Sequence, residues 1–118
     1  MRTAIRLNQN WLYCPDDISH GQSAKLNERN FTPVTLPHSN LALPWHDFDD
    51  KTYQFVSWYR RHFKVEKRWR DCRVLLEFEG VMIAAQVWVN GTFVGEHKGG
   101  YTPFLFDITD RLVWDKDN

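Results

Sequence analysis

A dipeptide in the second half of the chain, Asn90-Gly91, constrains the fold more than any other feature of the sequence. A two-residue type I′ turn needs positive φ at both central positions, and Asn-Gly is the pair that adopts it most readily. Short segments rich in strand-forming residues flank the pair, over 87–89 and 92–94. The stretch therefore predicts an antiparallel β-hairpin with its turn at 90–91.

A glycine loop is expected directly after this hairpin, over 96–104. Gly99-Gly100 allows backbone conformations that other residues resist, and Pro103 stiffens the return into the next strand. That strand is expected over 104–108. Loops on a rigid β-scaffold are where binding residues tend to lie, so this loop is the first place to look for a site.

The rest of the sequence predicts further short strands and no long helix, because no segment shows sustained helical periodicity. We expect strands over 34–36, 55–65, 74–80 and 82–89, and a helical turn over 110–114. The nearly continuous apolar run 82–89 predicts a strand buried on both faces. The long irregular stretch 38–52, which contains Trp45, is typical of a functional or interfacial loop. Many short strands with regular turn signals favour a β-sandwich or jelly roll.

Composition excludes several classes of function. The 118 residues suit one domain, and 15 Lys and Arg against 15 Asp and Glu give no net charge. Global charge therefore offers no argument for nucleic acid as a partner. No apolar run is long enough to span a membrane, and the first six residues lack the apolar region of a signal peptide. We expect a cytoplasmic protein, or an extracytoplasmic one if a signal was removed.

Metal and cofactor sites are not expected. Cys14 and Cys72 lack metal-ligand spacing, and the five histidines are scattered. One disulfide between the two cysteines is possible, but two free thiols are favoured.

Two local charge patterns have functional and structural interpretations. Glu77 and Glu79 lie two apart on an expected strand, roughly 7 Å from each other on one face, and glycoside hydrolysis uses paired carboxylates. A solvated strand face is the favoured interpretation.

The basic residues between 60 and 73, with His62 and Trp69 interleaved, resemble a nucleic-acid patch. A solvated hairpin with charged ends is favoured, since alternation sends these residues to both faces.

Five motifs occur along the chain in the order of a known family: Asn10-Trp11, Leu36-Pro37-His38, Ser57-Trp58-Tyr59-Arg60-Arg61, Phe78-Glu79-Gly80-Val81 and the stretch 87–110. Together they resemble the N-terminal sugar-binding domain of glycoside hydrolase family 2, the family of β-galactosidases, β-glucuronidases and β-mannosidases. The resemblance implies an all-β, jelly-roll β-sandwich like the galactose-binding domains. It also implies a single domain, 1–118, truncated at its C-terminus, because a further strand normally follows that position.

The resemblance implies the non-catalytic N-terminal domain of a retaining β-glycosidase. Its partners would be the catalytic barrel, the other domains of the parent enzyme and the carbohydrate substrate, whose site it helps to shape. The family's catalytic glutamates lie in the barrel, so no catalytic residue is expected in this chain. A free-standing carbohydrate-binding module, with an exposed aromatic platform, is one alternative. A structural interaction domain without sugar affinity is the other.

Four side chains are candidates for the rim of the sugar site: His97, Lys98 and Tyr101 from the glycine loop, and His38 from the long loop. The two histidines and the tyrosine also have structural interpretations, in which the histidines fix loop backbone and the tyrosine packs under its own loop or against a neighbouring domain. Some members of the family carry a carboxylate in the glycine loop. This chain has Lys98-Gly99-Gly100 there instead.

Overall fold

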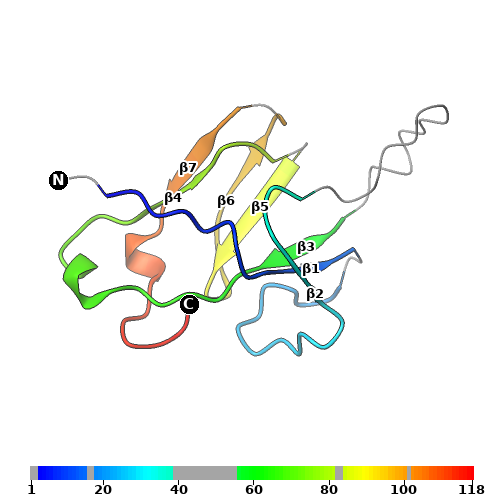
Figure 1. Ribbon diagram of the computed structural model, residues 1–118, viewed down its shortest axis with the longest axis horizontal. Coiled ribbons are helices and arrows are strands. Elements are labelled where there is room, and N and C mark those ends of the chain that lie inside the picture. Colours follow the sequence, from blue (N-terminus) through cyan, green and yellow to red (C-terminus); the bar gives the residue numbers. More distant parts are fainter. Residues whose placement is uncertain (1–2, 16–17, 39–55, 82–83, 101) are drawn as a thin grey trace. The chain divides into compact units, whose positions relative to one another are not determined.

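Seven short β-strands and two 3₁₀ turns make up the regular structure of the described residues (Figure 1). The structure is a computed structural model that describes residues 3–15, 18–38, 56–81, 84–100 and 102–118. Both helical turns in these ranges are too short to cross a membrane. The elements are β1 (Trp11–Cys14), β2 (Thr32–Val34), β3 (Trp58–Arg60), η1 (Lys67–Trp69), β4 (Leu75–Phe78), β5 (Ala84–Val89), β6 (Thr92–Lys98), β7 (Phe104–Asp107) and η2 (Thr109–Arg111).

Contacts divide the chain into two compact units. Unit 1 comprises Met1–Gly21 and Asn27–His62, and unit 2 comprises Gln22–Leu26 and Phe63–Asn118. In unit 1, β1 lies between β2 and β3 in an antiparallel sheet. Pro33 has no N–H to donate, and its place on the edge strand β2 is where a sheet tolerates this loss.

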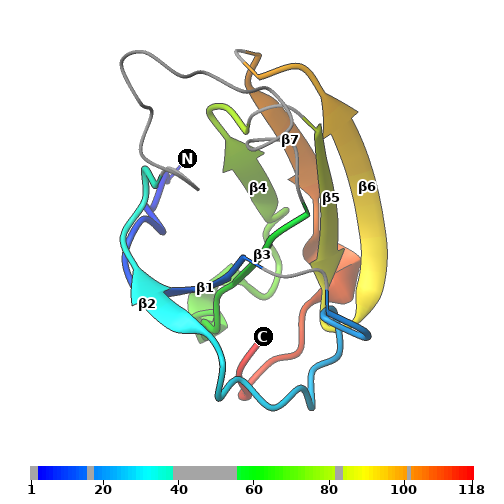
Figure 2. The ribbon, with the colours of Figure 1, turned by 90° about the vertical axis from the view of Figure 1, so that its right-hand side faces the viewer.

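Unit 2 contains two antiparallel pairs, β4 with β7 and β5 with β6 (Figure 2). Its core is a cluster of four buried residues: Val65, Val89, Ile108 and Leu112. Ile108 is 1% exposed and follows β7 directly. Partly buried side chains pack around this cluster, among them Phe106 from β7 and Val94 from β6. The core thus draws on strands and connections that are far apart in the sequence.

The predicted hairpin is confirmed. β5 pairs with β6, and the turn residues Asn90 and Gly91 have φ values of 52° and 80°, both positive as a type I′ turn requires. Trp88 pairs with Phe93 and Val87 with Gly95, so Val94 is an extra residue on β6 and forms a β-bulge. The bulged residue is one of those that pack on the core.

Valine in place of Gly91 should lower the free energy of unfolding by about 1–2 kcal/mol, because a β-branched residue is strained at positive φ. The nearest atom to a Cβ at this position would be the Gln22 carbonyl oxygen at 3.7 Å, so the strain comes from the backbone rather than from a clash. Asparagine at the same position is the matched control, since it tolerates this conformation. Equal denaturation midpoints for Gly91→Val and Gly91→Asn would contradict the explanation.

The expected strand 55–65 is much shorter in the structure. Among the described residues 56–65, β3 covers only Trp58–Arg60, which pair with Cys14, Tyr13 and Leu12 of β1. Beyond this point Phe63 exchanges backbone hydrogen bonds with Asn118 instead, with N···O distances of 3.1 and 2.8 Å. A strand needs a partner along its whole length, and the sequence pattern did not show where that partner ends.

Other boundaries also differ from expectation. The strand expected over 34–36 is Thr32–Val34, where its residues find partners on β1. The short strand after the hairpin is longer than expected, because β6 takes in the first three residues of the expected glycine loop and ends at Lys98. The helical turn lies at Thr109–Arg111, and the backbone N–H of Thr109 donates to the carboxylate of Asp107 directly before it. Burial of β5 on both faces is wrong: Ala84 and Gln86 are exposed.

Candidate functional site

The end of β6 holds two of the four predicted rim residues. His97 is half-buried, and its ring stacks on Phe104 of β7 with centroids 4.2 Å apart and planes 13° from parallel. Lys98 is exposed. Successive strand residues point to opposite faces, so these two side chains diverge rather than converge on one ligand. Gly99 follows with φ of 119°, and Tyr101 lies outside the described residues.

His97 belongs to a small stack of rings. Phe104 lies between the imidazole and Phe78 of β4, with its centroid 4.9 Å from that of Phe78. Nδ1 of His97 is buried and has no hydrogen-bond partner in the part of the chain that the structure describes. This nitrogen therefore does not fix the loop backbone. The ring contact with Phe104 is what holds the side chain.

His38, the fourth rim candidate, lies in unit 1 beside two tyrosines. Its Nδ1 is 2.8 Å from the hydroxyl oxygen of Tyr59, and its ring centroid is 4.6 Å from that of Tyr13. Tyr13 and Tyr59 are paired across β1 and β3, which places both rings on one face of the sheet. Burial raises the pKa of Tyr59 to about 12, with a further contribution from Tyr13. The imidazole itself is exposed.

A charged cluster in unit 1 was not predicted. Glu28 accepts hydrogen bonds from Arg60 Nε at 2.7 Å and from His62 Nε2 at 2.8 Å. Arg60 also donates to the carbonyl oxygen of Gly21. Burial raises the pKa of Glu28, but the hydrogen bonds and charges of Arg60 and His62 outweigh it and hold the pKa below 4.5. The cluster ties the segment around Glu28 to β3, which is a structural use of two residues from the basic run.

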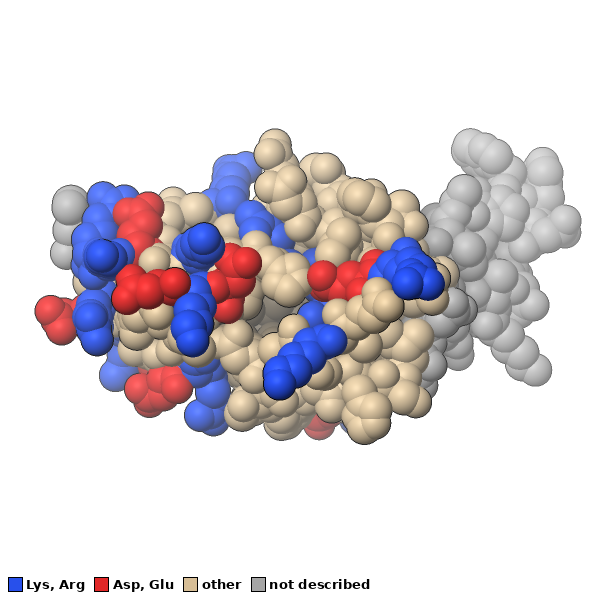
Figure 3. Space-filling view, turned by 90° about the horizontal axis from the view of Figure 1, so that it is seen from below, with Lys and Arg blue, Asp and Glu red and all other residues tan. Residues whose placement is uncertain are grey.

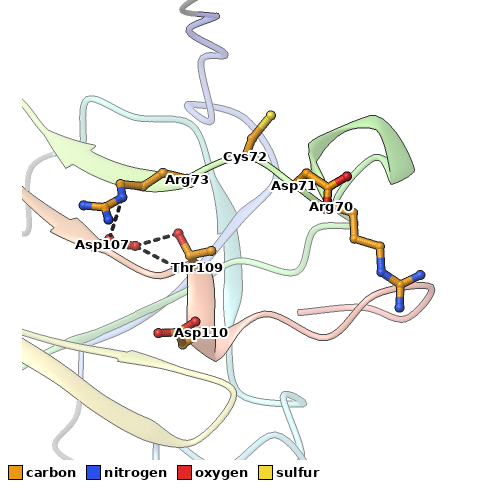
Figure 4. A pocket seen from close by; sticks show the side chains of 7 residues that line it. All are labelled: Arg70, Asp71, Cys72, Arg73, Asp107, Thr109 and Asp110. Carbon is orange, nitrogen blue, oxygen red and sulfur yellow. Dashed lines mark hydrogen bonds and ion pairs between the residues drawn. The ribbon is translucent and has the colours of Figure 1, made fainter.

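A polar hollow of about 400 Å³ in unit 2 has seven lining residues, drawn in Figure 4: Arg70, Asp71, Cys72, Arg73, Asp107, Thr109 and Asp110. Asp107 accepts from the Thr109 hydroxyl at 2.6 Å and from its backbone N–H at 3.0 Å, and these two bonds lower its pKa. Arg73 Nε is 3.5 Å from the same carboxylate. The Asp107 carboxylate is thus engaged in local hydrogen bonds that join the end of β7 to the start of η2, which is a structural use of the residue.

The remaining candidates are placed as follows. Glu77 and Glu79 are both exposed, but only Glu77 lies on a strand, because β4 ends at Phe78. Both thiols are free, Cys14 buried and Cys72 exposed. No group of three His, Cys, Asp or Glu suited to a metal ion occurs within the described ranges. On the face drawn in Figure 3, Lys and Arg side chains are interspersed with Asp and Glu rather than gathered in a patch of one sign.

Comparison with known proteins places these features in a family. Residues 4–117 match the family model described as "Glycosyl hydrolases family 2, sugar binding domain". A β-galactosidase of Thermoanaerobacter pseudethanolicus is 51% identical over 113 residues, which are 96% of this chain and 15% of that protein. A β-galactosidase of Thermoanaerobacterium thermosulfurigenes is 43% identical over 99% of this chain and 16% of its own length. A β-glucuronidase of Formosa agariphila is 30% identical over 99% of this chain and 13% of its own length.

Solved structures agree. Bacteroides uniformis β-glucuronidase 2 superimposes with a TM-score of 0.79 at 26% identity, over 95% of this chain and 13% of that one. A β-glycosidase from Bacteroides vulgatus has a TM-score of 0.79 at 26% identity, over 96% of this chain and 16% of that one. The predicted all-β fold and the resemblance to the family are confirmed. The chain spans about 15% of the length of the β-galactosidases that it matches.

Proposed function

Because this chain belongs to the sugar-binding domain family of the family 2 glycosyl hydrolases, we propose that it works as the N-terminal, non-catalytic domain of a larger retaining β-glycosidase. In this role it packs against the catalytic barrel and shapes the rim of the sugar site. One observation carries the proposal: the similarity runs through nearly all of this chain but only a small fraction of each enzyme that it matches.

The substrate that we propose for the parent enzyme is a β-galactoside. The two β-galactosidases share more identity with this chain than the β-glucuronidase of Formosa agariphila does. The position of Glu77 and Glu79 supports a non-catalytic role, since Glu77 is exposed on β4 and Glu79 is exposed directly after the end of that strand. A general acid of glycoside hydrolysis occupies an apolar pocket instead.

Within this proposal Lys98 and Tyr101 lie at the sugar site. Lys98 is exposed at the end of β6, directly before Gly99, and its ammonium group can donate to sugar hydroxyls. His97 supports the same loop from the opposite face of the strand, through its stack on Phe104. We therefore assign His97 a packing role and Lys98 a binding role.

Alanine in place of Lys98 should raise KM for an aryl β-galactoside in the intact glycosidase by about two- to tenfold, the worth of one hydrogen bond. The value of kcat should change little, because the contact is made with substrate and transition state alike. Tyr101→Ala should act in the same direction. Lys64→Ala, which removes another exposed lysine of unit 2, is the matched control. Wild-type kinetics for both Lys98→Ala and Tyr101→Ala would make the loop a packing element only.

One observation favours the alternative of a free-standing carbohydrate-binding module. Phe93 is 49% exposed on the β5–β6 hairpin and contacts Trp88 with ring planes 64° apart. The exposure of Phe93 favours the module, because exposed aromatic rings stack on sugars. The angle between the rings of Phe93 and Trp88 counts against it, because two rings at 64° do not form one flat platform. Titration of the chain alone with β-galactosides distinguishes the two functions: the module would bind in the absence of the barrel, and the Phe93→Ala variant would lose that binding.

A further inference from the structure

The side chain of Asn90, in the turn between β5 and β6, is bonded to a part of unit 2 that is distant in the sequence. Its Nδ2 donates to the backbone carbonyl oxygen of Arg111 at 2.7 Å and to Oδ1 of Asn118 at 2.9 Å. The direction of both bonds is settled, because the Arg111 carbonyl can only accept and Oδ1 of Asn118 also accepts the backbone N–H of Val113 at 2.7 Å. Both hydrogens of the Asn90 amide group are therefore used.

Asn90 is directly followed by glycine, and an Asn-Gly pair carries an intrinsic chemical reaction. The glycine nitrogen attacks Cγ of the asparagine, and a new C–N bond forms. The bond from Cγ to Nδ2 then breaks, and Nδ2 takes the proton of the attacking nitrogen and leaves as ammonia. Water opens the resulting succinimide ring at either carbonyl, which gives aspartate or isoaspartate. Gly91 favours the attack, because it is exposed and an added Cβ would meet no atom closer than 3.7 Å.

The two hydrogen bonds of Asn90 oppose this reaction. Ring closure requires the side-chain amide to turn toward its own backbone, which would pull Nδ2 away from the oxygens of Arg111 and Asn118. The reaction in the folded chain must therefore pass through a local opening in which both bonds are broken. The turn that carries the reactive pair is thus also the turn that restrains it.

We propose that Asn90 is a modification site, at which spontaneous deamidation is held back by the bonds to Arg111 and Asn118 and, once it has occurred, prevents those bonds from re-forming. A carboxylate has no hydrogen to donate, and it would face two oxygen acceptors. Val89, directly before Asn90, and Leu112, directly after Arg111, both belong to the buried cluster of unit 2. Deamidation is then a one-way change that loosens the hairpin from the end of η2 beside this core. The inference depends on contacts within unit 2 and not on the proposed function.

The site and its protection are tested by incubating this chain at mildly alkaline pH, with and without urea. Mass spectrometry of its peptides measures the aspartate and isoaspartate formed. In urea Asn90 should convert faster than the other asparagines, since it is the only one followed by glycine. In the folded chain its conversion should be slower by about tenfold or more, the worth of two hydrogen bonds. Equal rates with and without urea, or no conversion of Asn90 in urea, would overturn the proposal.

Two variants of Asn118 isolate the effect of its bond. Asn118→Ala removes the acceptor oxygen and should speed the conversion of Asn90 in the folded chain about two- to tenfold. Asn118→Asp keeps an acceptor oxygen for Nδ2 of Asn90 and should stay near the wild-type rate. Both variants lose the bond from Nδ2 of Asn118 to the Val113 carbonyl oxygen, so this loss does not distinguish them. Equal rates in the two variants would show that the Asn118 bond does not restrain Asn90.

The consequence for stability is tested with Asn90→Asp, which has a product side chain without any incubation. Its denaturation midpoint should be lower than that of the wild-type chain. Gln86→Glu makes the same change of charge at an exposed position of β5 and should leave the midpoint unchanged. Equal midpoints for Asn90→Asp and Gln86→Glu would overturn the loosening of the hairpin. This comparison and the one in urea decide the proposal even if Asn118→Ala does not fold.

Discussion

Alanine in place of Ile108 is expected to lower the free energy of unfolding by about 2–5 kcal/mol, the range for a large aliphatic residue removed from a closed core. Ile108 is 1% exposed and belongs to the cluster that also contains Val89 and Leu112. Its backbone N–H donates to the carbonyl oxygen of Val74 at 3.0 Å, so the site has little freedom to collapse around a cavity.

Denaturant titration measures this difference, and Val113→Ala is the control. Val113 is also aliphatic and lies close in sequence, but it is 41% exposed and its truncation should cost about 0.5 kcal/mol or less. If Ile108→Ala cost no more than Val113→Ala, the cluster around Ile108 would not be the core that stabilises unit 2.

The second large effect is expected where β6 meets β7. A Cβ on Gly95 would lie 2.5 Å from Cε1 of Phe106, much closer than real contacts allow. Phe106 is partly buried and packs against the core cluster, so a shift of its ring would disturb that packing. We expect Gly95→Ala to lower the free energy of unfolding by about 1–3 kcal/mol through overpacking.

A double-mutant cycle with Phe106→Leu isolates the cause. The smaller side chain should relieve the clash, so the double variant Gly95→Ala/Phe106→Leu should lose less stability than the sum of the two single losses, by about 1 kcal/mol or more. Additivity of the three measurements would show that Gly95 is required for another reason, such as the bulge at Val94.

Local sequence signals predicted the hairpin and most of the strands, because turn chemistry and alternation act over a few residues. Asn90 and Gly91 have the positive φ values that their turn type requires. The residues at which strands end were less predictable, since a strand end depends on where the neighbouring strand stops supplying backbone hydrogen bonds. The pairing of β3 with β1 ends at Arg60, and Phe63 exchanges backbone hydrogen bonds with Asn118, 55 residues away in the sequence.

The candidate site was predictable only in part. Motif order identified the family, whereas the assignment of His97 and Lys98 to the rim of a sugar site stays a prediction. Their divergence across β6 follows from the extension of that strand to Lys98, which the Gly99-Gly100 signal did not reveal. The ion pair of Glu28 with Arg60 and the bond of Tyr59 to His38 join residues 32 and 21 positions apart. Neither contact has a signature in a single sequence.

The measurement that tests the central claim most directly is hydrolysis of chromogenic β-galactosides and β-glucuronides, assayed for this chain alone and for the larger glycosidase that contains it. We expect turnover by the larger enzyme and none above background by the chain, because the function that we propose for this domain is to shape a sugar site and not to cleave the glycosidic bond. Turnover by the chain alone that disappears in Glu77→Gln or Glu79→Gln would contradict this account.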